Sequence, residues 1–210
     1  TTTNSLVGDI TGSLINDISF SPENQGTWVF DGTDDRLEIN ELVDIPLANS
    51  TFNIWVRPDQ ALGEGRKYQW CFTANGFYPA LGLAYTPPDG SITGTNSGSY
   101  DILSAALNVD RFILNTTGSI FQKEWTNVCV TKESGGTSGN KYNCKIYVNG
   151  VNQDTYFWDN TATQDWWVDN LSFTRFNLGG LYRPSATSNF GDTNIAPFSV
   201  YNRALSPDET

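Results

Sequence analysis

The chain of 210 residues closes with Phe198-Ser199-Val200-Tyr201, followed by Asn202-Arg203-Ala204-Leu205-Ser206-Pro207-Asp208-Glu209. Phe198 and Val200 are separated by one residue, which is the period of a strand that buries one face. Pro207 and the two acidic residues after it suit the first turn of a helix. This stretch therefore predicts a closing strand followed by a short terminal turn.

Four upstream blocks carry similar strand and turn signals. They are Val29-Phe30-Asp31-Gly32-Thr33-Asp34-Asp35, Phe52-Asn53-Ile54-Trp55-Val56-Arg57-Pro58, Trp125-Thr126-Asn127-Val128 and Ile146-Tyr147-Val148-Asn149-Gly150. Trp28 and Phe30, and then Leu37 and Ile39, alternate with polar residues, which predicts a pair of half-buried strands. Residues 32–35 between them are predicted to form a tight hairpin turn, because Gly and Asp tolerate left-handed backbone.

The rest of the chain continues this pattern of short strands and turns. Residues 125–132 and 142–148 predict a hairpin, residues 52–57 a strand closed by Pro58, and residues 171–178 another strand. Many short strands of this kind are typical of an all-β sandwich or jelly roll. Because no linker or change of composition divides the chain, residues 1–210 are predicted to form a single domain.

Charge and hydropathy exclude several classes of partner. The net charge is −11 with no histidine, which argues against a protein that binds the phosphate backbone of nucleic acid. No apolar run approaches the roughly 20 residues of a membrane span, so no membrane insertion is expected. The acidic balance fits an extracellular or virion surface, or attraction for divalent cations. The chain does not begin with Met and shows no signal peptide, so we expect a processed or excerpted chain.

The chain has three cysteines, Cys71, Cys129 and Cys144. If the hairpin turns near Gly136 and Thr137, Cys129 and Cys144 lie opposite each other, and a cross-strand disulfide is geometrically conceivable. The preferred interpretation is two small buried apolar residues. The odd count and the spacing indicate neither a disulfide scaffold nor a zinc site.

Taken in order, the five blocks resemble the laminin G-like, concanavalin A-like jelly-roll domain, from about Trp28 to Glu209. The resemblance implies a concanavalin A-like jelly-roll sandwich of two antiparallel sheets. It also implies that Trp28, Trp55 and Trp125, which lie within or beside the blocks, belong to the core. This fold hosts lectins, adhesins, virion proteins and some hydrolases, so the fold alone does not give the activity.

The first and last blocks look most like laminin G-like modules of tailed-bacteriophage virions, and bacterial surface proteins carry the same module. The resemblance implies a location on a virion surface or outside the cell, and a non-catalytic adhesion module that binds host surface glycan. The alternative is a structural virion module, a capsid decoration, fibre or tail part, that docks onto other virion proteins without sugar. A homo-oligomer is compatible with both. The family's last motif usually runs on past Thr210, so a longer parent chain is expected.

Catalysis is not expected. Glucanases of this fold resemble one another in a strand motif of Glu, Asp and Glu at alternate inward positions, and retaining chemistry needs two carboxyl groups about 5–5.5 Å apart. The nearest pattern here, Glu38-Ile39-Asn40-Glu41, lacks the middle carboxylate and the spacing. A Ser or Cys nucleophile usually needs a histidine base, and the chain has none.

Calcium is the one cofactor that the resemblance suggests, because laminin G-like domains often hold Ca²⁺ on a loop at the sandwich rim. Ca²⁺ needs several oxygen ligands, and Asp34 and Asp35 are the candidate metal ligands. The family carries this pair mainly as turn residues, so a capped turn is the preferred interpretation. The family's acidic residue after the Ile of the final motif is missing, because this chain has Ile195-Ala196-Pro197. Other acidic candidates are Asp31, Asp89, Asp101, Asp159, Asp165 and Asp169.

Aromatic and polar side chains gather between Tyr156 and Asn170. Neighbours on a strand point to opposite faces, so only one of Trp166 and Trp167 can enter the core if they lie on a strand. The other ring is a candidate platform for the apolar face of a pyranose. The predicted glycan-binding residues are Trp158, Asp159, Asn160, Asp165, Trp166, Trp167 and Tyr182. The alternative is that these aromatic residues fill the ends of a large sandwich.

Overall fold

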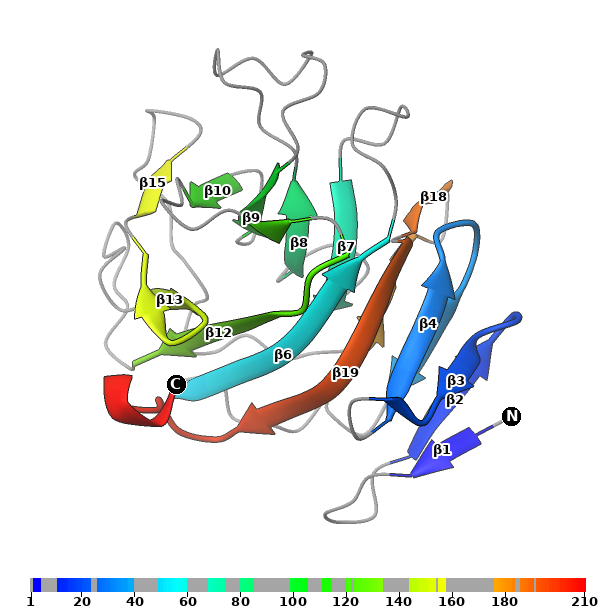
Figure 1. Ribbon diagram of the computed structural model, residues 1–210, viewed down its shortest axis with the longest axis horizontal. Helices are drawn as coiled ribbons and strands as arrows, with labels where there is room; N and C mark the ends of the chain where they lie inside the picture. The colour runs from blue at the N-terminus through cyan, green and yellow to red at the C-terminus, as the bar shows by residue number, and fades with distance from the viewer. Residues whose placement is uncertain are drawn as a thin grey trace.

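The computed structural model is built of antiparallel β-strands (Figure 1). It describes residues 2–4, 11–23, 26–39, 49–59, 68–74, 80–84, 99–105, 111–114, 120–121, 123–133, 144–153, 155–157, 176–183, 186–190 and 192–210. Two large sheets make up most of this part, as the resemblance implies, and a separate two-stranded sheet accompanies them. Within the described residues, no helix has the length and apolarity needed to cross a membrane.

The larger sheet has ten strands. Its path is β1 (Thr2–Asn4), β2 (Thr11–Ile15), β5 (Arg36–Ile39), β16 (Phe176–Leu178), β7 (Tyr68–Ala74), β8 (Ala80–Ala84), β9 (Ser99–Ala105), β10 (Arg111–Leu114) and β15 (Thr155–Phe157), with β11 (Ile120–Phe121) paired to β9. The two-stranded sheet consists of β17 (Gly180–Arg183) and β18 (Ala186–Phe190).

The other large sheet has seven strands. Its order is β14 (Val151–Asn152), β13 (Cys144–Val148), β12 (Thr126–Lys132), β6 (Ser50–Pro58), β19 (Asp192–Tyr201), β4 (Thr27–Asp31) and β3 (Ser19–Ser21). The chain ends in a 3₁₀ turn, Pro207–Glu209, at the position predicted for a helical start. The strands predicted around residues 52–57, 125–132 and 198–200 are confirmed, and so is the turn at Asn149 and Gly150.

The core lies between the two large sheets. On β6, Phe52, Ile54 and Val56 are fully buried, as the period of two requires for one face of a strand. Phe176 of the ten-stranded sheet stacks on Phe52, with 6.2 Å between ring centroids, and on Phe198 of β19 at 5.4 Å. These aromatic contacts join the two layers of the sandwich.

The predicted hairpin of residues 27–30 and 37–39 is wrong in its pairing. The strands β4 and β5 exist, but β4 pairs with β3 and β19 in the seven-stranded sheet, whereas β5 pairs with β2 and β16 in the ten-stranded sheet. The turn at 32–35 therefore crosses the rim from one sheet to the other. Alternation in the sequence indicates which face of a strand is buried, and it does not identify the partner strand.

The register of β12 and β13 does not place Cys129 and Cys144 opposite each other. Cys129 lies opposite Tyr147, and Cys144 lies opposite Lys132. Cys129 is a free, fully buried thiol, and burial raises its pKa to about 12. The preferred interpretation of Cys129 as a small buried apolar residue is confirmed, and the cross-strand disulfide is not formed.

The C-terminal segment packs against the face of the seven-stranded sheet that points away from the core. The Thr51 hydroxyl donates a hydrogen bond to the carbonyl of Arg203 and accepts one from the amide of Leu205, both at 2.9 Å. Leu205 is buried, and the chain ends beside the turn that follows β13 (Figure 1). This segment covers one end of β6 and leaves the middle of the strand open.

Candidate functional site

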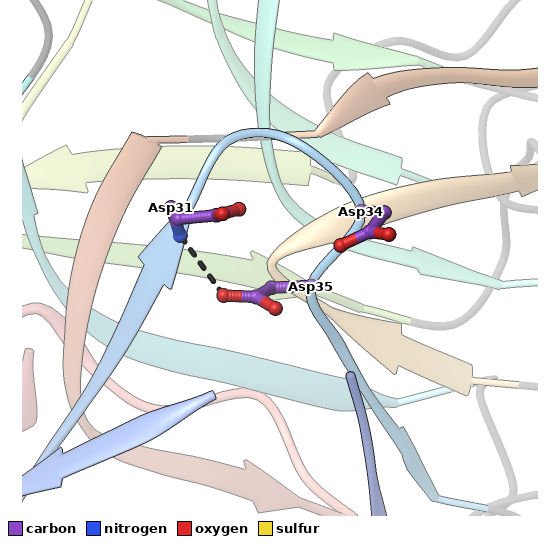
Figure 2. Close-up of side chains that lie close together, drawn as sticks. All are labelled: Asp31, Asp34 and Asp35. Atoms are coloured by element: carbon purple, nitrogen blue, oxygen red, sulfur yellow. Dashed lines mark hydrogen bonds between the residues drawn. The ribbon is translucent and has the colours of Figure 1, made fainter. Parts of the chain in front are cut away.

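The turn between β4 and β5 brings three carboxylates together. Asp31 ends β4, and Asp34 and Asp35 precede β5, so the two sheets position them at the rim of the sandwich. Ligand oxygens of the three side chains all lie within 4.8 Å of one another. Figure 2 shows the carboxylates turned towards one another inside the turn. The structure thus places the predicted pair Asp34 and Asp35 side by side and adds Asp31 as a third member.

Hydrogen bonds hold the turn but leave carboxylate oxygens unused. Asp35 Oδ2 accepts the amide of Asp31 at 3.0 Å, and Asp31 Oδ1 accepts the amide of Thr33 at 2.7 Å. Asn16, at the end of β2, donates its side-chain amide to the carbonyl of Asp34 at 2.7 Å. These bonds confirm that the acidic residues cap a turn. Asp35 Oδ1 is nevertheless buried with no hydrogen-bond partner.

The electrostatics of the turn are unfavourable for three negative charges. Asp35 is only 2% exposed, and its burial is the largest cause that raises its pKa. The negative charges of Asp31 and Asp34 raise it further, against the backbone amides of Asp31 and Asp17, which lower it. The next cation along the chain, Arg36, pairs with Glu38 at 2.8 Å. None of the ion pairs among the described residues involves the three carboxylates.

A second candidate lies on the outer face of β6, in the middle of the seven-stranded sheet (Figure 1). Trp55 is 41% exposed, because Phe52, Ile54 and Val56 take the core-facing positions. On one side its cross-strand partner is Asn127 of β12. On the other side β19 bulges, since two residues, Ala196 and Pro197, stand opposite the single residue Trp55. The indole is therefore displayed in the middle of a sheet face.

Three asparagines form an amide network beside Trp55. Asn127 donates its side-chain amide to Asn53 Oδ1 at 2.6 Å, and its backbone amide bonds to Asn149 Oδ1 at 2.9 Å. Asn149, in the left-handed turn after β13, donates its backbone amide to the carbonyl of Asn127. Within the described residues, the side-chain NH₂ groups of Asn53 and Asn149 have no partner. They remain available to hydrogen-bond a ligand.

Arg57 lies on the same face of β6 as Trp55. The Arg57 guanidinium lies over the Trp125 ring, 5.4 Å from its centroid, and Arg57 Nε is 3.3 Å from Asp59 Oδ1. Asp59 also accepts a hydrogen bond from the side chain of Asn194. The charge of Arg57 is thus matched by Asp59.

The expectation that Trp28, Trp55 and Trp125 all belong to the core is wrong for Trp55. Trp28 and Trp125 are half-buried, and Trp28 packs on the exposed Phe20 with ring centroids 4.9 Å apart. The signal for Trp55 was present in the sequence, because Trp55 alternates with Phe52, Ile54 and Val56 and shares its period with Asn53 and Arg57.

The predicted glycan platform is not described by the structure. Trp158, Asp159, Asn160, Asp165, Trp166 and Trp167 lie outside the described residues, as do Asp89 and Asp169. Tyr182 lies on β17 opposite Thr187, but its side chain is outside the described part. Asp101 lies on β9, remote from the acidic turn in the sheet order. The predicted platform therefore stays a prediction.

Solved structures with a similar fold come from several kinds of protein. The botulinum neurotoxin serotype D ligand-binding domain in complex with N-acetylneuraminic acid has a TM-score of 0.60 and 12% identity, over 96% of this chain and 44% of that chain. A SAP-like pentraxin from Limulus polyphemus has a TM-score of 0.52 and 14% identity, over 96% of this chain and 79% of that chain. A Trypanosoma rangeli sialidase has a TM-score of 0.60 and 16% identity, over 96% of this chain and 28% of that chain.

At these identities the structural similarity shows the fold alone, and this chain spans less than half of the toxin domain. No curated protein sequence is significantly similar to the chain. A family model, described as the concanavalin A-like lectin/glucanases superfamily, matches residues 31–210, which is most of the sequence. The chain therefore belongs to the concanavalin A-like lectin/glucanases superfamily.

Proposed function

We propose that this chain is a non-catalytic glycan-binding module that works on the surface of a virion or a cell. The observation that carries the proposal is the exposed Trp55 indole beside the amide network of Asn53, Asn127 and Asn149. An indole offers an apolar face to the C–H side of a pyranose, and neighbouring amides can bond its hydroxyls. Both parts of that chemistry lie on one sheet face.

The fold relatives support this function without fixing the sugar. One toxin domain of this fold was solved with bound N-acetylneuraminic acid, and the sialidase was solved in complex with 2,3-difluoro-KDN. The face around Trp55 differs from what an anionic sugar requires, because the nearby cation Arg57 is matched by Asp59 and the chain carries a net charge of −11. We therefore expect neutral sugars, with free hydroxyl or acetamido groups, to bind in preference to sialylated ones.

The test is a glycan array with the wild-type chain and with Trp55→Ala. Losing a central aromatic contact costs about 2 kcal/mol, so we expect the affinity for bound glycans to fall roughly 30-fold. Phe20→Ala is the matched control, because Phe20 is a more exposed aromatic residue on the edge strand β3. Far-UV circular dichroism and melting temperature establish that both variants fold.

The array also separates the proposal from its competitors. Binding that survives Trp55→Ala but is lost in Trp166→Ala or Trp167→Ala would move the site to the predicted platform. A blank array with a folded chain would contradict glycan binding and favour a module that docks onto other virion proteins. Hydrolysis of a bound glycan, detected as released reducing sugar, would contradict the non-catalytic assignment.

A further inference from the structure

We infer that the C-terminal segment, residues 202–210, is a detachable cover over a second aromatic part of the face that displays Trp55. This face continues from Trp55 and Asn53 of β6 onto β12 and β13. Cys129 lies opposite Asn53, and Tyr147 lies opposite Cys129, so their side chains point to the same side of the sheet. Trp55 is 41% exposed, whereas Tyr147 is 2% exposed and Cys129 is fully buried. Part of an outer sheet face is therefore hidden.

The C-terminal segment crosses the hidden part of the face. It leaves β19 opposite Thr51 of β6, and the Thr51 hydroxyl bonds the backbone of Arg203 and Leu205. At the other end of the segment, the Thr210 oxygen would lie 3.3 Å from a Cβ atom at Gly150, in the turn after β13 (Figure 1). The segment therefore runs from β6 over β12 to β13, across the two buried side chains.

The attachment of this segment to the sheet is small. Leu205 is the buried residue of the segment, and the 3₁₀ turn at residues 207–209 buries none. Glu209 accepts hydrogen bonds from Arg203 and Ser206, which lie within the segment itself. Such internal bonds are kept when the segment moves away as a unit. Opening then loses chiefly the burial of Leu205 and the two bonds of Thr51, so it should occur far more often than unfolding of the sandwich.

Opening would add a second ring to the aromatic face. Tyr147 lies two strands from β6 and one row from Trp55, which separates their backbone positions by about 12 Å at ordinary strand spacing and rise. A single sugar ring on Trp55 does not reach that far, whereas an oligosaccharide does. This consequence rests on the proposed function: an extended glycan would select the open form, because both rings and the Asn53 amide are then accessible to it.

Cys129 reports on opening, because a thiol reagent can reach this buried side chain only when the cover is displaced. The experiment measures the rate of Cys129 labelling at increasing urea concentration, with peptide mass mapping to separate it from Cys71 and Cys144. Opening of the segment alone exposes little surface, so at low urea the rate should hardly depend on urea. Leu205→Ala should increase this low-urea rate roughly 30-fold, because it removes much of the buried contact.

Val128→Ala is the matched control for Leu205→Ala. Val128 precedes Cys129 on β12, is 1% exposed and lies opposite Ile54 on the core side of the sheet. The substitution should lower the stability of the whole chain and leave the low-urea labelling rate of Cys129 unchanged. A wild-type labelling rate with the full urea dependence of global unfolding would overturn the inference. Equal acceleration in Val128→Ala and Leu205→Ala would also overturn it.

The effect on binding is measured with the neutral oligosaccharide that binds most strongly on the array and with its terminal monosaccharide. Leu205→Ala should strengthen oligosaccharide binding by up to roughly 30-fold, because more of the chain is open, and should leave monosaccharide binding unchanged. Equal oligosaccharide affinity in Leu205→Ala and the wild type would overturn the assignment of the hidden part to the binding face. A chain that binds no glycan contradicts the proposed function instead, and the labelling of Cys129 does not depend on that outcome.

Discussion

The Asp35 carboxyl serves two opposed roles in the same turn. Its Oδ2 caps the amide of Asp31 and so stabilises the turn, while its buried charge faces the charges of Asp31 and Asp34. Burial and these two neighbours raise its pKa, so the folded chain holds this proton more tightly than the unfolded chain does. The cost of the charge is therefore present in the folded state when no cation relieves it.

This balance predicts a pH-dependent effect of Asp35→Asn in chelator. At pH 7 the variant should be more stable than the wild type by roughly 1 kcal/mol. Its side-chain oxygen still accepts the hydrogen bond from the Asp31 amide, and the buried negative charge is gone. The pKa of Asp35 is higher in the folded wild type than its unfolded value of 3.8, so the protonated carboxyl group stabilises the fold at pH values below 3.8. This stability is lost as the pH rises through the folded pKa. The difference should therefore shrink as the pH falls towards 3.8.

Urea unfolding of both chains between pH 7 and 3.8, in chelator, measures this difference directly. The difference between the two chains cancels the effects that do not involve Asp35. A variant that is less stable than the wild type at pH 7, or a difference independent of pH, would contradict the prediction.

At the scale of elements, much of the strand pattern could be predicted, because alternation of apolar and polar residues records burial directly. The strands around residues 27–30, 52–57 and 125–132 follow from this alternation. The sequence could not show that β4 and β5 belong to different sheets. Nor could it show that the residue opposite Cys144 is Lys132, three positions along β12 from Cys129. Partner and register depend on long-range packing, which no local pattern encodes.

The candidate sites divide in the same way. Asp34 and Asp35 could be predicted as turn residues from the sequence, because Asp close to Gly is a local signal for a turn. That Asp35 would be buried with an unpartnered oxygen depends on the crossing between sheets, so it could not be found. Trp55 could have been placed on the outer face from the period of β6 alone. The amide network could not, because Asn53, Asn127 and Asn149 come from three separate segments.

The turn at Gly179, between β16 and β17, shows how closely these elements pack. Gly179 has φ +82°, and a Cβ atom there would lie 2.1 Å from Cδ1 of the buried Phe30. Gly179→Ala should therefore lower the free energy of unfolding by about 3 kcal/mol or more, from overpacking added to backbone strain. Urea denaturation gives this value.

Gly150→Ala is the matched control for that substitution. Gly150 also has a positive φ, +77°, but the nearest atom to its Cβ position is the Thr210 oxygen at 3.3 Å. It should cost only about 1–2 kcal/mol, the strain of a left-handed backbone. Equal losses in the two variants would show that the Phe30 ring yields and that packing at Gly179 is not tight.

At the scale of the whole molecule, the C-terminal segment covers one end of the outer face of the seven-stranded sheet. Arg203 makes two hydrogen bonds to Glu209, at 2.9 and 2.7 Å, and the amide and hydroxyl of Ser206 bond to Glu209 as well. The Arg203 hydrogen bonds, followed by those of Ser206, lower the pKa of Glu209 to about 2. The segment is thus folded on itself through a charged pair and attached to the sheet through Thr51 and Leu205.

The attachment through Thr51 can be tested with an isosteric substitution. Thr51 is fully buried, and its hydroxyl bonds both Arg203 and Leu205, so Thr51→Val leaves a backbone amide and a carbonyl without their partner. We expect a loss of about 2–3 kcal/mol in the free energy of unfolding. Hydrogen exchange at the Leu205 amide should also accelerate, because the segment separates from the sheet more often than the whole chain unfolds.

Thr131→Val provides the comparison within the same sheet. Thr131 lies directly opposite Thr51 and is also buried, but no described residue bonds its hydroxyl. The same change of atoms there should alter stability by less than about 1 kcal/mol and leave exchange at Leu205 unchanged. If Thr51→Val and Thr131→Val lose equal stability, the cost belongs to any Thr→Val change in this row of the sheet. The terminal segment would then be held by Leu205 packing and the Arg203–Glu209 pair, with no dependence on the Thr51 hydroxyl.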